Sequence, residues 1–127
     1  MRKMGIALAL ATGLALLVPA GGAIAGDRDV IREGACTRSS DWKLKLSPED
    51  GGLEVEFEVD QNVTGDRWRV RIRQDGDLVF RGVRTTRGAS GSFEVRIAES
   101  NRAGADRFRG KAVNLATGER CVGTGTF

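Results

Sequence analysis

The 127-residue chain contains no histidine and no tyrosine, and it has only two cysteines and two prolines. Without histidine, it lacks the Ser-His and Cys-His pairs of nucleophilic catalysis and imidazole ligands for a metal. Carboxylates are present, but Glu54, Glu56 and Glu58 alternate along one expected strand face, whereas a glycosidase needs two carboxyl groups framing a cleft. These absences predict a protein that is not an enzyme, with no catalytic residues, no metal site and no cofactor.

The chain has a single long apolar run, and this run lies near the amino terminus. Residues 6–18 are apolar, follow Arg2 and Lys3, and precede a small-residue motif that ends at Ala25. A membrane-spanning helix needs about 20 apolar residues, so this run is too short to be a transmembrane segment. We therefore predict a Sec signal peptide over residues 1–25, cleavage after Ala25, and a secreted protein.

A large excess of one charge sign is also missing. Arg2 and Lys3 belong to the expected signal peptide, and the rest of the chain has 18 basic and 17 acidic residues. This near balance gives no reason to expect nucleic acid as a partner. The distribution is uneven, however, because residues 26–60 carry 5 basic and 10 acidic side chains whereas residues 61–127 carry 13 and 7.

Cys36 and Cys121 are the only cysteines, so only one intramolecular pairing exists. An exported chain meets an oxidising compartment that permits a disulfide, and no CxxC motif suggests redox or zinc chemistry. The Cys36–Cys121 bridge would close a loop of about 85 residues and stabilise the fold by roughly 4–5 kcal/mol.

Apolar and charged residues alternate strictly in two neighbouring segments, 53–60 and 67–74. A period of two is typical of a strand with one buried face. Together with turn signals, the pattern predicts seven strands, over residues 42–47, 53–60, 67–74, 77–83, 92–98, 106–115 and 119–127. We expect an all-β, seven-stranded antiparallel sandwich over residues 36–127, after a loose lead-in over residues 26–35. The expected core residues are Phe57, Trp68, Val70, Ile72, Phe80, Phe93, Val95 and Ile97.

The turn after residue 74 allows two strand registers. A two-residue loop would pair Ile72 with Val79 and leave Leu78 and Phe80 exposed. A three-residue loop over residues 74–76 with a bulge would pair Ile72 with Leu78 instead. We favour the second register, because it buries two large apolar side chains, each worth about 1.5–3 kcal/mol.

Several short motifs resemble an immunoglobulin or fibronectin type III domain over residues 40–127. They are the seven expected strands, Trp68 at the start of the third, and Phe-Arg-Gly-Lys-Ala-Val-Asn at 108–114 followed by Thr117-Gly118. The chain lacks the tyrosine corner of such domains, and Cys36–Cys121 is not the bridge of antibody domains. The whole chain also resembles small exported single-domain bacterial proteins of unassigned activity. These resemblances imply a binding or adhesion module.

The meaning of the charged strands depends on their pairing. If segments 53–60 and 67–74 form a hairpin, their carboxylates and arginines make a ladder of ion pairs. In a sandwich of the immunoglobulin type they lie in opposite sheets, and the arginine row joins the cations of the sixth strand. The candidate face for an anionic partner is then Arg69, Arg71, Arg73, Arg107, Arg109 and Lys111.

Two functions remain open at this stage. One is a secreted binding or adhesion module of the cell envelope, whose partner is an anionic envelope polymer or another extracellular protein. The other is a small secreted inhibitor- or toxin-like effector that acts through a loop at residues 85–91 or 99–105. Trp68 and Phe108 fall on the apolar parity and cannot stack on bases, which again argues against nucleic acid.

Overall fold

The computed structural model describes residues 28–127, so the expected signal peptide and its cleavage site lie outside the described residues. Residues 28–127 are all-β, and none of them belongs to a helix that could cross a membrane. The all-β prediction is therefore confirmed. The strands are β1 (Val30–Ala35), β2 (Asp41–Glu49), β3 (Gly52–Asp60), β4 (Arg67–Gln74), β5 (Asp77–Thr85), β6 (Ser92–Ser100), β7 (Arg107–Asn114) and β8 (Arg120–Thr126).

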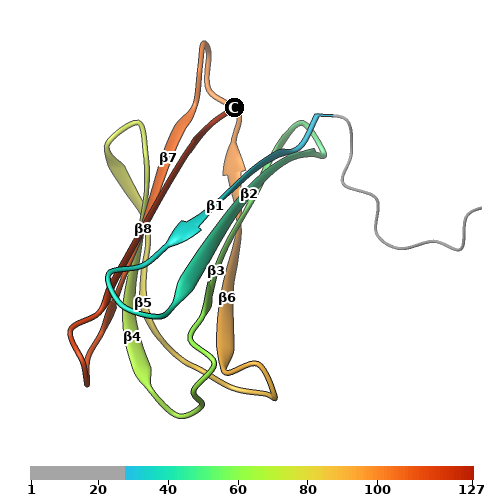
Figure 1. The fold of residues 1–127 in the computed structure, drawn as a ribbon. Coiled ribbons are helices and arrows are strands. Elements are labelled where there is room, and N and C mark those ends of the chain that lie inside the picture. Colours follow the sequence, from blue (N-terminus) through green and yellow to red (C-terminus); the bar gives the residue numbers. More distant parts are fainter. Residues whose placement is uncertain (1–27) are drawn as a thin grey trace, which may run out of the picture.

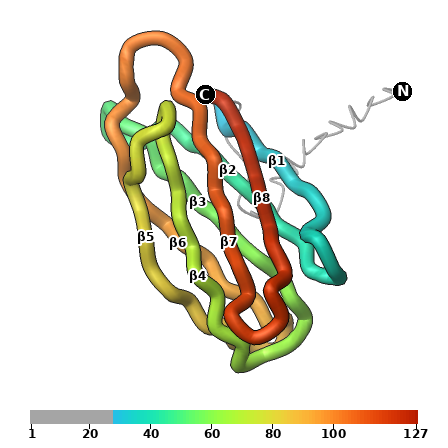
Figure 2. The backbone as a smooth tube through the Cα atoms, turned by 90° about the vertical axis from the view of Figure 1, so that its left-hand side faces the viewer, coloured from blue at the N-terminus to red at the C-terminus, as the bar shows by residue number. Residues whose placement is uncertain are grey.

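The strands form two antiparallel four-stranded sheets that pack face to face as a sandwich (Figure 1). Sheet 1 has the order β1-β2-β3-β6, and sheet 2 has the order β5-β4-β7-β8, which faces the viewer in Figure 2. The chain crosses between the sheets after β3, so β3 and β4 are not hydrogen-bonded neighbours. This excludes the ion-pair ladder and selects the sandwich alternative.

The core lies between the sheets and follows the alternation of the sequence. Along β4 every second side chain is buried, including Trp68, Val70 and Ile72, and the arginines between them are exposed. Six of the eight expected core residues are buried, whereas Phe80 and Ile97 are only partly buried. Those two lie on β5 and β6, which are edge strands and therefore have a neighbouring strand on one side only.

The sandwich has eight strands rather than seven, because part of the expected lead-in is ordered. Strand β1 pairs antiparallel with β2 at the edge of sheet 1, placing Gly34 opposite Trp42. A Cβ at Gly34 would lie 2.7 Å from the Trp42 ring, so the site needs glycine. The segment Arg32-Glu33-Gly34 shows no apolar alternation, so a strand could not be predicted here from the pattern of residues.

The β4–β5 hairpin differs from both expected registers. Asp75 and Gly76 have φ values of 49° and 88°, as a two-residue type I′ turn requires. A bulge at Val79 of β5, opposite the step from Ile72 to Arg73, then shifts the register, so that Ile72 pairs with Phe80. The favoured three-residue loop is therefore wrong, and Leu78 is 44% exposed rather than buried. The bulge returns Phe80 to the core side after a turn that alone would have exposed it.

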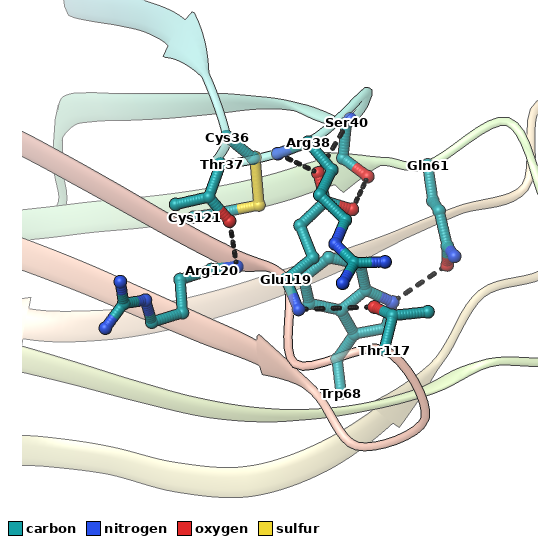
Figure 3. Close-up of a disulfide and its surroundings, with 10 residues drawn as sticks. All are labelled: Cys36, Thr37, Arg38, Ser40, Gln61, Trp68, Thr117, Glu119, Arg120 and Cys121. Carbon is teal, nitrogen blue, oxygen red and sulfur yellow. Dashed lines mark hydrogen bonds between the residues drawn. A yellow bond between two sulfur atoms is a disulfide. The ribbon is translucent and has the colours of Figure 1, made fainter.

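A disulfide joins the two sheets, as predicted (Figure 3). Cys36 follows β1 of sheet 1 and Cys121 lies in β8 of sheet 2, with an S–S distance of 2.06 Å. Beside the bridge, the buried carboxylate of Glu119 accepts hydrogen bonds from the N–H groups of Arg38 and Ser40 at 3.0 and 2.9 Å. It also accepts one from the Ser40 hydroxyl at 2.6 Å, so the β1–β2 connection is held on the β7–β8 turn.

Candidate anion-binding face

Strands β4 and β7 lie side by side in sheet 2, and their side chains alternate in step between the core and the outer face. Their inward side chains and glycine are buried, and Phe108, Gly110 and Ala112 face the core as the sandwich alternative requires. A Cβ at Gly110 would lie 2.9 Å from the Phe57 ring, so the sheets approach closely here. The residues between them are exposed on the outer face, and they are the six predicted cations Arg69, Arg71, Arg73, Arg107, Arg109 and Lys111.

The strand register places like charges directly opposite one another. Arg71 pairs with Lys111, and Arg73 pairs with Arg109. On the other side of β4, Arg81 of β5 pairs with Arg71, so Arg81, Arg71 and Lys111 form one rung of three cations. Like charges in directly opposite positions destabilise a sheet.

Arg81 was missed as a site residue in the sequence. The alternation from Phe80 to Arg81 was the signal for its outward direction, but only the bulged register places it beside Arg71. We call the seven residues of this surface the cationic face; they are Arg69, Arg71, Arg73, Arg81, Arg107, Arg109 and Lys111.

No carboxylate neutralises the cationic face. Within residues 28–127, none of its seven side chains forms an ion pair with an aspartate or glutamate. In the adjacent β4–β5 hairpin, Arg102 contacts Asp77 at 2.9 Å and Asp75 at 3.6 Å, and Asp75 also accepts a hydrogen bond from the backbone N–H of Arg107 at 2.8 Å. The Arg73 guanidinium donates a hydrogen bond to the carbonyl of Gly76 at 3.1 Å, which leaves its charge uncompensated.

Two shallow hollows follow the seam between β4 and β7. The larger, about 200 Å³, is lined by Arg71, Arg73, Arg109 and Lys111. The smaller, about 130 Å³, is lined by Arg69, Arg71, Lys111 and Val113. Each hollow is thus surrounded by several donors of charge-assisted hydrogen bonds, which suits an oxyanion such as a phosphate or carboxylate group.

The outer face of sheet 1 also carries many charges, but there they are paired. Arg96 of β6 contacts Glu56 at 2.6 Å, Glu94 at 3.1 Å and Glu54 at 3.8 Å, and these carboxylates raise the pKa of its guanidinium. Lys45 lies 3.9 Å from Glu56. Burial, and next the nearby Glu94, raise the pKa of Glu58 above its ordinary value. The acidic row therefore has cations of its own sheet, unlike the arginine row.

Within residues 28–127, no three histidine, cysteine, aspartate or glutamate side chains are grouped so that they could hold a metal ion. Comparison with known proteins gives no match, because no family model, curated protein or solved structure is significantly similar to this chain. Fold and site together define a small disulfide-bonded β-sandwich with one uncompensated cationic face.

Proposed function

We propose that the protein is a secreted, non-catalytic binding module that holds an anionic component of the cell envelope on its cationic face. The observation that carries the proposal is the rung of Arg81, Arg71 and Lys111, with which no carboxylate of residues 28–127 forms an ion pair. Exposed like charges in one rung lower the stability of the sheet, and a single carboxylate among them would relieve this. Keeping the rung uncompensated makes sense if an external anion supplies the missing charge.

The strand order supports a relation to immunoglobulin and fibronectin type III domains. Strands β2, β3 and β6 correspond to A, B and E, and strands β5, β4, β7 and β8 correspond to C′, C, F and G. Strand β1 is then an addition at the edge of the first sheet. Domains of this architecture mostly serve as binding and adhesion modules, which agrees with the proposed role.

The physical basis of binding is local potential rather than net charge. The potential of an exposed charge decays over about 8–10 Å at physiological salt, so the face attracts anions although the chain is nearly neutral. Guanidinium groups can bind phosphate or carboxylate groups through two parallel hydrogen bonds. Because the face is flat and exposed, we expect weak binding that depends strongly on salt.

Co-sedimentation tests the proposal. Protein mixed with purified, insoluble anionic cell-wall polymer should sediment with it at low salt and be released at high salt. The double variant Arg71→Glu/Arg109→Glu should stay in the supernatant. Arg84→Glu/Arg87→Glu makes the same change of charge outside the seam and should still sediment. No sedimentation of the wild type at low salt, or equal sedimentation of both double variants, would contradict the proposal.

The loop-effector alternative makes a different prediction. If residues 85–91 or 99–105 act alone, replacing exposed residues of these loops should abolish activity, and the cationic-face variants should have no effect. Screening both sets of variants in the same pull-down from the cell envelope separates the two functions. The pull-down could instead capture another extracellular protein. If this capture requires the arginines and decreases as salt is added, the binding site is the proposed one and only the partner differs.

A further inference from the structure

The two hollows of the seam are consecutive along the strands. Arg71 and Lys111 line both of them, so each hollow lies between this rung and one of its two neighbours. Neighbouring rungs on one face are two residues apart, which is about 6.7 Å along a strand. The seam therefore presents two anion sites at a spacing fixed by the sheet itself.

This spacing corresponds to a particular class of polymer. Two residues of extended peptide contain six backbone bonds, and so does the path between successive phosphorus atoms in a 1,3-linked glycerol phosphate chain. When both chains are extended, the distance between successive phosphates is therefore close to the distance between successive rungs. We propose that the β4–β7 seam binds a linear polyol phosphodiester of this six-bond repeat, laid along the strands with one phosphate in each hollow. This inference rests on the proposed function and names the partner of the same face.

The hollows differ in the number of cations that line them, and this sets the order in which they are occupied. The larger hollow is lined by four cations, whereas Val113 replaces one cation in the smaller hollow. A single phosphate should therefore occupy the larger hollow first. A second phosphate at the six-bond distance then binds as part of the same molecule, which increases affinity through effective concentration.

The face is poorly suited to nucleic acid, although single-stranded DNA has the same six-bond repeat. Affinity for single strands depends on aromatic side chains that stack on bases. Trp68 and Phe108 are buried, and the partly buried Phe80 is covered by the Arg84 guanidinium at 5.1 Å. The seam can thus hold the backbone phosphates of such a chain but offers its bases no aromatic side chain to stack on.

The test compares soluble probes that differ in phosphate spacing. Dissociation constants are measured at one low ionic strength for glycerol monophosphate and for glycerol phosphate oligomers of two to six repeats. Inorganic polyphosphate, with two bonds between phosphorus atoms, and 1,5-linked ribitol phosphate oligomers, with eight, are matched to them in number of phosphates. The six-bond probes should bind roughly tenfold more tightly than either, and affinity should rise most between one and two phosphates.

Variants assign the effect to the seam. Arg71→Gln removes a cation that both hollows share and should weaken the six-bond probes roughly tenfold. Arg69→Gln alters only the smaller hollow and should weaken a two-phosphate probe while leaving glycerol monophosphate unchanged. Arg87→Gln makes the same change of charge in the β5–β6 connection and should change affinity less than about twofold.

Each outcome separates this inference from the proposed function. If all three phosphate polymers bind alike, the spacing argument is overturned although the cationic face still binds anions. If an oligodeoxynucleotide of equal phosphate number binds more tightly than the glycerol phosphate oligomer, the partner class is nucleic acid. If no phosphate probe binds at low salt but the protein still sediments with anionic cell-wall polymer, the inference fails and the proposed function stands. If neither binds, both fail.

Discussion

The two outer faces of the sandwich carry similar numbers of charged strand residues, but they differ in whether these residues lie beside the opposite charge. On sheet 1, Arg96 sits among Glu54, Glu56 and Glu94, all within 4.0 Å of its guanidinium. On sheet 2, Arg71 lies on the inner strand β4, and its direct neighbours across the strands are Arg81 and Lys111. The first face has ion pairs within its own sheet, whereas the cationic face forms none with the carboxylates of residues 28–127.

This difference separates a solvated charged surface from a candidate binding site. In sequence, the glutamate row of β3 and the arginine row of β4 look equivalent, since both alternate with apolar residues. Only the neighbouring strands tell them apart. An alternating charged strand is therefore evidence for a site only when its flanking strands fail to supply the opposite charge.

The largest expected effect comes from moving a charge from the outer side of β4 to the inner side. Val70→Asp places an unpaired carboxylate in the core and should lower the free energy of unfolding by at least about 4 kcal/mol, enough to prevent folding. Arg71→Asp, one residue away, inserts a carboxylate into the rung of cations and should be tolerated. Thermal unfolding followed by circular dichroism measures both. Equal losses would show that the assignment of inner and outer faces is wrong.

The next effect concerns the bridge that connects the two sheets. Reducing Cys36–Cys121, or replacing both cysteines with alanine, should cost about 2–5 kcal/mol and lower the melting temperature by roughly 10 °C or more. Titration of the unfolded, unreduced protein should find no free thiol. Two thiols per chain, or an unchanged melting temperature after reduction, would contradict the role of the bridge.

A smaller effect compares the two faces by removing one cation from each. Arg96→Gln leaves three carboxylates of sheet 1 without their shared partner and should lower the melting temperature. Arg71→Gln relieves repulsion on sheet 2 and should raise it or leave it unchanged. Both changes should shrink as salt is added, because exposed charges are screened. Shifts of the same sign in both variants would show that the faces do not differ in charge pairing.

The smallest effect is a dependence on pH that involves sheet 1 alone. The pKa of Glu58 is raised in the folded protein, chiefly by burial and next by Glu94, so the folded state holds this proton more tightly than the unfolded state. Stability from this group therefore falls as the pH rises through the range just above the ordinary value of 4.5. Glu58→Gln should be more stable than the wild type at pH 7.

This advantage should vanish on acidification, once Glu58 itself is protonated. Asp66→Asn is the matched control of opposite sign. Hydrogen bonds from Asn114 and Gln61 lower the pKa of Asp66, so its contribution is present at neutral pH and is lost as the pH falls below 3.8. The measurement is the melting temperature of the wild type and both variants between pH 3 and pH 7. It shows whether each carboxyl group raises or lowers stability as the pH falls. An advantage of Glu58→Gln that persists at low pH would contradict the assignment.

The sequence predicted the parts of this fold that depend on one strand alone. Alternation in β3, β4 and β7 identified the buried side of each strand, and the cysteine count predicted the bridge. It failed where the outcome depends on a partner. Strand β1 has no alternation and forms only because β2 offers a free edge and Gly34 leaves room for Trp42.

The candidate site shows the same division. The outward direction of its six predicted cations followed from parity, but the membership of Arg81 depended on the bulge in β5. The hairpin has both a two-residue type I′ turn and a bulge in β5. The two registers expected from the sequence each had only one of these features. Charge compensation by Arg96 and Arg102 could not be predicted either, because it depends on which strands become neighbours.

The most direct test of the difference between the two faces is to map binding on the protein by nuclear magnetic resonance. Glycerol phosphate oligomer is added at low salt, and backbone amide shifts are followed residue by residue. We predict shifts along β4 and β7 and at Arg81, with β2, β3 and β6 unchanged, and reversal of these shifts when salt is added. Shifts on sheet 1, or shifts confined to residues 85–91 and 99–105, would contradict the claim that the uncompensated cations of sheet 2 are the binding site.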